Sequence, residues 1–225
     1  MKVLVVGVGA LGTEVIKTLV LLGVKDICLV DCDRIEMSNL SRQMFFRHDH
    51  IGLFKAETAA TVLQKTWPWL RIEYRNSPVE ELAVSFFEQF TIVVCSVDSV
   101  KTRRWLNSLI VGDLRKPLIE GGTEGLLGHA RLIDSASACV ECTIDFYPQT
   151  RQLPCGQYYQ EEGANEPMAS VCTTNAIIGA IMAKMLLDHS GSFVLYNGTE
   201  AVFMDSLKID KRKDCFVCSY GNFTA

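Results

Sequence analysis

The sequence has no apolar run long enough to cross a membrane. Its two most apolar stretches, 3–24 and 176–187, are interrupted by Glu14 and Lys17 in the first and by Lys184 in the second, whereas a membrane-spanning helix needs ~20 predominantly apolar residues. The pattern of a signal peptide is also missing, because the first apolar run opens directly into a glycine pattern. We therefore expect no membrane association and a cytoplasmic or nuclear location.

An excess of positive charge is missing as well. The 225 residues include 22 Lys and Arg against 26 Asp and Glu, for a net charge of −4, so we expect no binding to nucleic acid. Histidine is scarce: the four residues form no spaced cluster, and we assign them no role. With 48% hydrophobic and 21% charged residues and no low-complexity tract, the composition excludes disorder, collagen and coiled coil.

Strand and helix patterns alternate in the first half of the sequence and become less regular in the second. Apolar runs predict strands over 3–6, 27–30, 72–74, 92–95, 117–120, 130–133, 193–197 and 202–207. Helical spacing predicts helices over 11–22 and 56–63, the end of another at 86–90, and one long helix over 173–187. This order predicts an α/β fold with a doubly wound, Rossmann-like, mostly parallel sheet.

Three glycines at GxGxxG spacing, Gly7, Gly9 and Gly12, lie between the first predicted strand and the first predicted helix. Asp31 ends the next strand, where a carboxylate accepts hydrogen bonds from ribose hydroxyls. Such glycines let the backbone approach a phosphate at a helix N-terminus. The pattern predicts a nucleotide site, and the alternative is a tight turn without a ligand.

The residues after Asp31 separate a redox cofactor from a nucleoside triphosphate. Two cations and two amides follow closely, together with a second acid, at Asp33, Asn39, Arg42, Gln43 and Lys55. A hydride-transfer enzyme has no need for Arg and Lys near a polyphosphate, whereas a triphosphate needs such charge-assisted hydrogen bonds. We therefore expect ATP, and the alternative for the two cations is an ordinary solvated face.

Four of the nine cysteines form two CxxC pairs, separated by a long insertion: Cys139, Cys142, Cys215 and Cys218. In a reducing compartment such pairs are typical of metal ligands rather than disulfides. Four thiolates give the tetrahedral sulfur set that zinc prefers in structural sites. The alternative is a group of buried free thiols.

The order of these motifs resembles the ubiquitin-activating enzymes and their bacterial ThiF and MoeB relatives. The shared pattern is GxGxxG, DxD, SNLxRQ (here 38–43, SNLSRQ), GxxKA (52–56) and an Asp after the fourth strand, Asp98. Within this family the chain looks most like the catalytic subunits of neddylation-activating enzymes. The segments that carry this closer likeness are 42–47, 120–131, 139–144, 174–176 and 215–219.

The resemblance implies a role for each matching residue. Asp31, in a DxD pair with Asp33, would hold the ATP ribose, and Asn39, Arg42 and Lys55 would contact the phosphates, with Gln43 supporting that site. Asp98 would bind Mg²⁺; its alternative role is the N-cap of a helix that begins at Val100. Arg42, Lys55 and Asp98 would then be the catalytic groups of the adenylation, and the two CxxC pairs match the family's zinc site.

The acceptor of a thioester is less clearly marked. The best match to the family's nucleophile is Cys155, which follows Leu153 and Pro154. The rival is Cys172, which lies where the long helix is predicted to begin, because a helix N-terminus lowers a thiol pKa. The third alternative is that the chain has no thioester cysteine.

We expect one ThiF-like adenylation domain over 1–225. Its nucleotide-binding half would be 1–135, and 136–225 would hold the crossover, the long helix, the C-terminal strands and the zinc-stapled lobe. The resemblance implies that the family's large catalytic-cysteine domain and ubiquitin-fold domain are missing, and also the helix that carries a phosphate-contacting Arg. A second subunit would therefore supply that Arg, in a heterodimer rather than a homodimer.

The implied function is ATP-dependent activation of a ubiquitin-like modifier. The chain would adenylate the modifier's C-terminus, form a thioester, and pass the modifier to a conjugating enzyme. Three alternatives stay open: a SUMO-type activating subunit, a sulfur-carrier adenylyltransferase, and a non-catalytic partner subunit.

Overall fold

The computed structural model describes residues 1–147, 171–188, 193–199 and 203–219. Its strands are β1 (Lys2–Val6), β2 (Asp26–Val30), β3 (Arg71–Arg75), β4 (Ile92–Cys95), β5 (Leu118–Glu124), β6 (Leu127–Ile133), β7 (Phe193–Asn197) and β8 (Phe203–Leu207). Its α-helices are α1 (Ala10–Leu21), α2 (Lys55–Thr66), α3 (Val84–Glu88), α4 (Val100–Leu106), α5 (Cys172–Asp188) and α6 (Phe216–Ser219). Shorter or irregular helical turns are η1 (Met37–Ser41), η2 (His48–His50), η3 (Val79–Glu81), η4 (Asn107–Asp113) and η5 (Glu141–Phe146).

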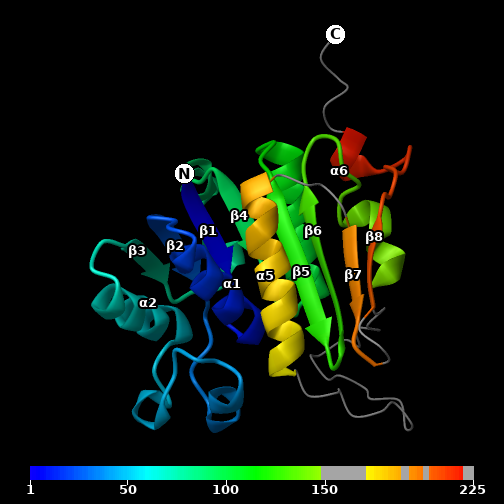
Figure 1. The fold of residues 1–225 in the computed structure, drawn as a ribbon. Helices are drawn as coiled ribbons and strands as arrows, with labels where there is room; N and C mark the ends of the chain where they lie inside the picture. The colour runs from blue at the N-terminus through cyan, green and yellow to red at the C-terminus, as the bar shows by residue number, and fades with distance from the viewer. Residues whose placement is uncertain (148–170, 189–192, 200–202, 220–225) are drawn as a thin grey trace, which may run out of the picture.

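The eight strands form one sheet in the order β3-β2-β1-β4-β5-β6-β7-β8 (Figure 1). The first five in this order pair in parallel, and β5 to β8 pair antiparallel. The predicted doubly wound, Rossmann-like α/β fold is confirmed, with an antiparallel extension on one side. The strands β1, β2 and β4 lie in the interior of the sheet, which explains why they are continuous apolar runs.

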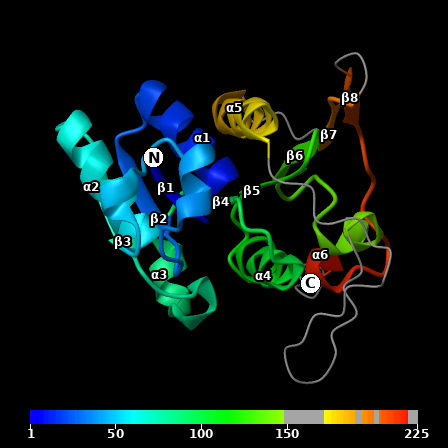
Figure 2. The ribbon, with the colours of Figure 1, turned by 90° about the horizontal axis from the view of Figure 1, so that it is seen from below.

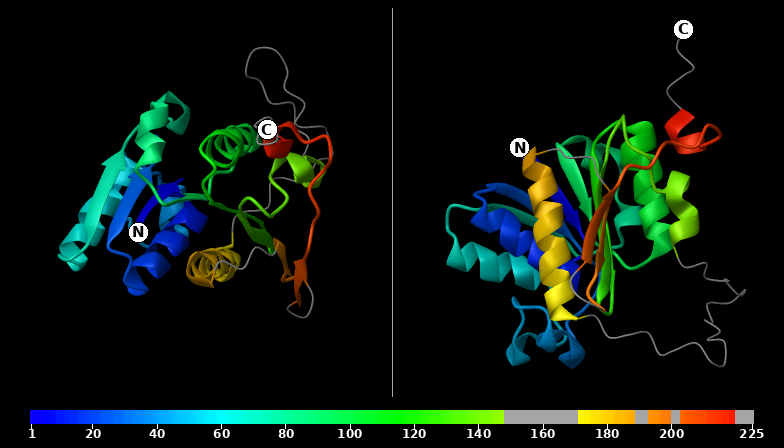
Figure 3. Two further views of the ribbon diagram at one scale, coloured as in Figure 1. Left: turned by 90° about the horizontal axis from the view of Figure 1, so that it is seen from above. Right: turned by 45° about the vertical axis from the view of Figure 1, so that its right-hand side comes forward.

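Helices cover both faces of the sheet, as Figures 2 and 3 show for α5 and α4. Successive residues of β1 face opposite layers, because side chains alternate along a strand. Val3 and Val5 pack in the layer of α1, α2 and α5, whereas Leu4 and Val6 pack in the layer of α3, α4 and η4. The sheet therefore has a buried core on each side.

The long helix α5 crosses α1 at close range. A Cβ on Gly179 would lie 2.7 Å from the Cβ of Glu14 and 3.1 Å from the backbone nitrogen of Val15. A glycine is therefore required where the two helices meet. The predicted end of the first helix near residue 22 is confirmed: Leu22 is the C-cap of α1, and Gly23, with a φ of +82°, follows it directly.

Several helical segments were not predicted as elements, and the longest of them is α4 together with η4. The helix α4 continues into the π-helical segment η4, and together they cover one face of the sheet between β4 and β5. A helix beginning at Val100 was expected only under the alternative role of Asp98 as an N-cap. Within the described residues, no helix combines the length and the apolar character needed to cross a membrane.

Candidate functional site

A cavity of about 480 Å³ lies at the carboxyl ends of the parallel strands β1, β2 and β4. Its volume is in the usual range for cofactor pockets, ~300–1,000 Å³. Open α/β sheets bind ligands at this edge, where neighbouring connections turn to opposite faces. Of the ten residues expected at the nucleotide, nine line the cavity: Gly7, Gly9, Asp31, Asp33, Asn39, Arg42, Gln43, Lys55 and Asp98.

The glycines of the GxGxxG turn have different tasks. Gly7 has a φ of +93°, and a Cβ there would lie 2.9 Å from the backbone oxygen of Ser96. Gly12, the tenth expected residue, does not line the cavity; its Cβ would lie 2.0 Å from the oxygen of Gly7, so it serves close packing of the helix on the turn. A Cβ on Gly9 would meet nothing within 4 Å. The turn therefore leaves open space beside Gly9, where the backbone faces the cavity.

Asp31 is fixed by the backbone around it. The N–H of Val8 donates to its Oδ2 (2.6 Å) and the N–H of Asp33 donates to its Oδ1 (2.8 Å). Burial raises the pKa of the Asp31 carboxyl above its ordinary value, although these two hydrogen bonds act in the opposite direction. Each carboxylate oxygen can accept a second hydrogen bond, so Asp31 can still receive a pair of hydroxyl groups.

Lys55 and Asp33 form an ion pair at the cavity wall. The Nζ of Lys55 lies 2.8 Å from the Oδ2 of Asp33, and the Lys55 side chain is only 10% exposed. Lys55 is the first residue of α2, so its position is set by the start of that helix. An ammonium has three donors, and pairing with Asp33 leaves two for another anion.

Arg42, Asn39 and Gln43 lie in and just after η1. The guanidinium of Arg42 donates to the carbonyl of Ser38 (2.8 Å), and Oδ1 of Asn39 accepts from the N–H of Glu36 (2.9 Å). Gln43 is 4% exposed and lines the cavity, yet its Oε1 has no hydrogen-bond partner among the described residues. A buried acceptor without a partner is costly, so this atom is suited to a donor on a ligand.

Asp98 is exposed at the end of β4 and does not cap the following helix. The N-cap of α4 is Ser99, whose hydroxyl accepts a hydrogen bond from the N–H of Thr102 (3.2 Å). The alternative that made Asp98 the cap is therefore wrong. Its carboxylate lies at the cavity wall, where it is available to a cation.

Several residues of the cavity wall were not predicted from the sequence. Arg103 of α4, Gly122 and Thr123 of β5, and Asn175 of α5 all line it. The Thr123 hydroxyl donates to Oδ1 of Asn175 (2.8 Å), which ties β5 to the first turn of α5. Arg103 follows Asp98 by five positions in the sequence, and this closeness was the only sign that it could lie at the same site. No local pattern showed that the Arg103 side chain turns toward the cavity.

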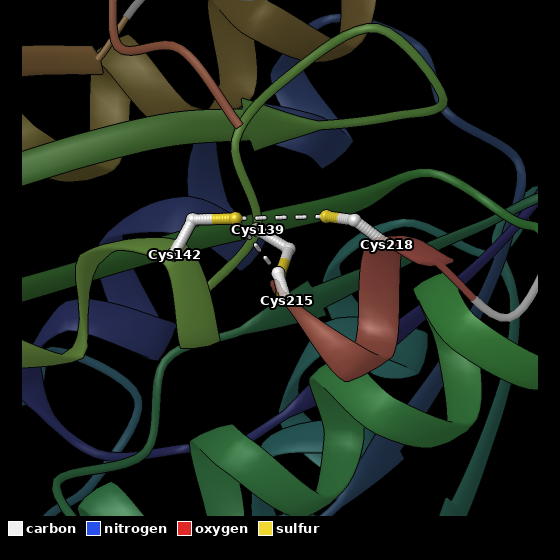
Figure 4. Close-up of side chains that lie close together, drawn as sticks. All are labelled: Cys139, Cys142, Cys215 and Cys218. Atoms are coloured by element: carbon white, nitrogen blue, oxygen red, sulfur yellow. Dashed lines mark hydrogen bonds between the residues drawn. The ribbon is translucent and has the colours of Figure 1, made fainter. Parts of the chain in front are cut away.

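The two CxxC pairs come together as one cluster (Figure 4). The four Sγ atoms lie within 4.8 Å of one another, with distances of 3.9 Å for Cys139 to Cys142, 3.5 Å for Cys139 to Cys215, and 3.6 Å for Cys142 to Cys218. Thiolates on a tetrahedral zinc lie ~3.8 Å apart for Zn–S bonds of ~2.3 Å, whereas a disulfide requires ~2.05 Å. The spacing of these sulfur atoms fits a metal and not a disulfide.

The surroundings of the cluster are those of a closed structural site. Burial raises the pKa of the Cys215 thiol to about 11 and also raises the pKa of Cys218. The backbone N–H of Arg212 donates to the Sγ of Cys142 (3.3 Å), a contact that stabilises a thiolate. None of the four cysteines lines the cavity, so the cluster and the cavity are separate sites.

Of the two candidate thioester cysteines, only Cys172 lies in the described part of the chain. Cys155 lies outside the described residues. Cys172 is exposed and is the first residue of α5, three positions before Asn175 in the cavity wall. The predicted start of the long helix at this cysteine is therefore confirmed.

Comparison with known proteins identifies a family and several relatives of this chain. The model of the ThiF family matches residues 1–217. The chain is 39% identical over 166 residues to the Nedd8-activating enzyme E1 catalytic subunit of Drosophila melanogaster, covering 68% of this chain and 37% of the relative. It is 29% identical over 294 residues to the NEDD8-activating enzyme E1 catalytic subunit of Saccharomyces cerevisiae, covering 98% of each.

The chain is also similar to a SUMO-activating subunit and to a solved structure. The chain is 40% identical over 144 residues to SUMO-activating enzyme subunit 2 of Dictyostelium discoideum, covering 63% of this chain and 22% of the relative. The solved structure of E. coli MccB with ATP superposes with a TM-score of 0.76 at 20% identity, covering 97% of this chain and 67% of that chain. At that identity the likeness establishes the fold alone. The chain spans well under half the length of the fly and Dictyostelium relatives.

Proposed function

The chain belongs to the ThiF family, and on that premise we propose that it is the catalytic subunit of a heterodimeric NEDD8-activating enzyme. It would use ATP to adenylate the C-terminal carboxylate of the modifier. The names of the fly and yeast relatives support this choice of modifier. A thioester on this chain and transfer to a conjugating enzyme would follow, in the cytoplasm or the nucleus.

One observation carries the proposal. The cavity gathers the turn that holds Gly9, the carboxylates of Asp31 and Asp98, and the cations Arg42 and Lys55 from separate parts of the sheet edge. A non-catalytic partner subunit has no use for all of these groups at one cavity. A redox dinucleotide needs no cations at this position, so the set favours a triphosphate.

The residues at the cavity fit Mg·ATP. Three features can make contacts with the nucleotide: the open backbone beside Gly9, the Oε1 of Gln43, which has no partner among the described residues, and the two free lone-pair positions of the Asp31 carboxylate. Asp31 would accept the ribose hydroxyls, and Asp98 would hold the metal ion. Bound Mg·ATP supplies an α-phosphorus that the modifier's carboxylate oxygen attacks, with pyrophosphate leaving as its P–O bond breaks.

The contribution of the protein is to position and neutralise charge. Arg42, Lys55 and Asn39 would contact the phosphates, and Lys55 can do so without leaving Asp33 because it has further donors. Preorganised cations of this kind stabilise negative charge that spreads in the transition state. In a heterodimer, a second subunit would add an Arg to the same phosphates.

We propose that the cysteine cluster holds one structural zinc ion. The donor set of four thiols and their mutual distances fit a tetrahedral site without an open position. Zinc would join η5 and Cys139, two residues before it, to α6 and Cys215, one residue before it, although the two segments are far apart in the sequence. Its role would be to fix the C-terminal lobe, because no cluster residue reaches the cavity.

A SUMO-type activating subunit is the second candidate. The Dictyostelium relative is as similar in sequence as the NEDD8-type relatives, though over a smaller share of this chain. The residues at the nucleotide would be the same for both modifiers. Only the choice of modifier distinguishes the two candidates.

The test is modifier-dependent exchange of pyrophosphate into ATP, measured for the chain alone and together with its native partner subunit. We expect exchange with NEDD8 and not with SUMO, and only in the complex. Asp98→Ala should lower the exchange rate by at least ~100-fold, since the triphosphate loses its metal ligand. The control Asp113→Asn removes a carboxylate that is exposed outside the cavity and should leave the rate unchanged. Full exchange in Asp98→Ala would contradict the assignment, and exchange with SUMO alone would favour the second candidate.

A further inference from the structure

Glu120 is the centre of a buried polar cluster behind the cavity. Its carboxylate is 0% exposed and accepts hydrogen bonds from Arg103 Nη1, from Arg131 Nε (3.0 Å) and from the Tyr147 hydroxyl (2.8 Å). The Nε2 of His129 lies 3.2 Å from the same carboxylate. One carboxylate therefore faces two guanidinium groups in the interior.

The cluster carries more positive than negative charge. Burial and the two arginines lower the pKa of His129 to about 3, so it is neutral at pH 7. Burial raises the pKa of Tyr147, which is neutral too. A buried charge is stabilised by an opposite charge, so a guanidinium of this cluster that still has an unused donor can bind a further anion.

The two guanidinium groups are not equally engaged. Arg131 donates to Glu120, to the Thr143 hydroxyl (2.7 Å) and to the Tyr147 hydroxyl (2.6 Å), and Thr143 adjoins the cysteine cluster. Arg103 makes its hydrogen bonds with Nη1 alone, to Glu120 and to the carbonyl of Gly121 (2.9 Å). No described residue accepts a hydrogen bond from Nη2 of Arg103. The uncompensated donor is therefore on Arg103.

This donor lies at the cavity wall. Arg103 and Gly122 both line the cavity, and a Cβ on Gly122 would lie 3.0 Å from Arg103 Nη2. Glycine at this position thus leaves room between the guanidinium and the cavity. The side chain is 7% exposed, so Glu120 holds it in one place rather than letting it move through solvent.

The position of Arg103 separates it from the groups assigned to the phosphates. Arg42 and Lys55 lie on the side of β2, whereas Arg103 reaches the cavity beside β4 and β5, next to Gly122 and Thr123. Of the groups assigned to the nucleotide, Asp98 also follows β4, but it would hold the metal ion rather than a phosphate, so a second anionic reactant can bind beside Arg103. In the proposed reaction that reactant is a carboxylate.

We propose that Arg103, held by Glu120, binds the C-terminal carboxylate of the modifier and positions it for attack on ATP. This inference rests on the proposed function. The charge-assisted hydrogen bond from Nη2 is lost when the carboxylate becomes a neutral acyl adenylate, so the contact belongs to the substrate before reaction. Arg103 acts as a binding residue, and Glu120 acts through it as a positioning residue.

The test compares Arg103→Gln and Arg103→Lys with wild type in the complex with the native partner subunit, using NEDD8- and ATP-dependent pyrophosphate exchange. We expect Arg103→Gln to raise the KM for NEDD8 about tenfold or more, which corresponds to ~1.4 kcal/mol, while the KM for ATP changes less than about twofold. Arg103→Lys keeps the charge and should restore part of the loss. Lys101→Gln, an exposed residue of the same helix, is the matched control.

A second measurement separates recognition of the carboxylate from a structural role. NEDD8 with its terminal carboxylate converted to an amide should be a weak competitive inhibitor of the wild-type enzyme, because it lacks the charge that Arg103 binds. The Arg103→Gln enzyme should no longer distinguish the amide from the free acid. An increased KM for ATP in Arg103→Gln would overturn the inference and assign Arg103 to the phosphates. Unchanged constants for both substrates would also overturn it. If wild type shows no exchange with NEDD8, the proposed function itself fails.

Discussion

His129 shows how neighbouring charges decide the protonation state of one residue. Its ring lies 3.2 Å from Glu120, stacks on Phe193 with centroids 5.6 Å apart, and shares its surroundings with Arg103 and Arg131. Burial and these two cations lower its pKa from 6.5 to about 3. The nearby carboxylate does not reverse this effect, because both arginines already bind it.

The first prediction at this scale concerns pH. The unfolded imidazole takes up a proton below pH ~6.5, whereas the folded one stays neutral down to about pH 3. The unfolded state therefore binds more protons in this window, and stability is lost as the pH falls, by up to ~1.4 kcal/mol per pH unit. Urea unfolding of wild type and His129→Asn between pH 6.5 and 5 should show a steeper loss in wild type.

The control for this prediction is His48→Asn, since His48 is exposed at the protein surface. It should keep the wild-type dependence on pH. Equal slopes for wild type and His129→Asn would mean that His129 becomes protonated in the folded protein as readily as in the unfolded chain.

The second prediction at the residue scale concerns the thioester, with Cys155 as the expected acceptor. Cys155→Ala should lose the thiol-sensitive, ATP-dependent NEDD8 adduct on a non-reducing gel, and Cys172→Ala should keep it. Attack requires a thiolate, and Arg151 stands four positions before Cys155 in the sequence, where a cation close to the thiol would favour that form. Cys32, an exposed thiol of the cavity wall, supplies the control, and Cys32→Ala should keep the adduct.

The opposite outcome has a structural basis as well. Cys172 is exposed one helical turn before Asn175 of the cavity wall, so it lies near the cavity where we propose that adenylation takes place. Loss of the adduct in Cys172→Ala alone would make Cys172 the acceptor. Adduct formation by both variants would leave the chain without a thioester at either position.

At the scale of elements, the contact between α1 and α5 fixes one wall of the cavity. The helix α5 brings Asn175 to the wall, and α1 begins at the GxGxxG turn. The two helices approach closely only because Gly179 has no side chain. Any larger residue there must push α5 away from α1 or distort one of them.

Gly179→Val should therefore destabilise the protein by ~1–3 kcal/mol, the usual cost of overpacking a core. The matched control is Ala180→Val, which places the same side chain at the next, exposed position of α5. Denaturant unfolding monitored by circular dichroism measures both. Equal stabilities of the two variants would contradict close packing at Gly179.

At the scale of the whole molecule, the cysteine cluster joins segments that the sequence keeps far apart. Cys139 and Cys142 precede the segment 148–170, and Cys215 and Cys218 lie in and just before α6. A metal here closes a long loop, which lowers the conformational entropy of the unfolded chain. The core on the face of α1, α2 and α5 contains none of these thiols, whereas Cys139, Cys142 and Cys215 belong to the core on the other face of the sheet.

We predict one zinc ion per chain in freshly purified protein, measured by elemental analysis. A chelator, or the substitution Cys215→Ser, should increase hydrogen exchange in η5 and α6 while β1, β2 and β4 stay protected. Cys28→Ser is the control, because Cys28 is a buried thiol of β2 outside the cluster. Protein that contains no zinc and yet shows full protection of α6 would contradict a metal site.

The sequence alone determined the features that depend on consecutive residues. Buried strands such as β1 and β4 are uninterrupted apolar runs, and the GxGxxG turn and the two CxxC pairs have fixed short spacings. Their physical basis is local, because it consists of side-chain periodicity, backbone freedom at glycine, and ligands one turn apart. For the same reason the ends of α1 and α5 were predicted closely.

Only the tertiary structure decided which distant side chains meet. It showed that Ser99 rather than Asp98 caps α4, that Lys55 pairs with Asp33, and that Glu120 holds Arg103 at the cavity. These outcomes depend on how elements distant in the sequence pack together and on the cost of burying charge, which no short segment encodes. The sequence therefore identified most residues of the proposed nucleotide cavity and the cysteine pairs, whereas the fold revealed Arg103 in the wall of that cavity.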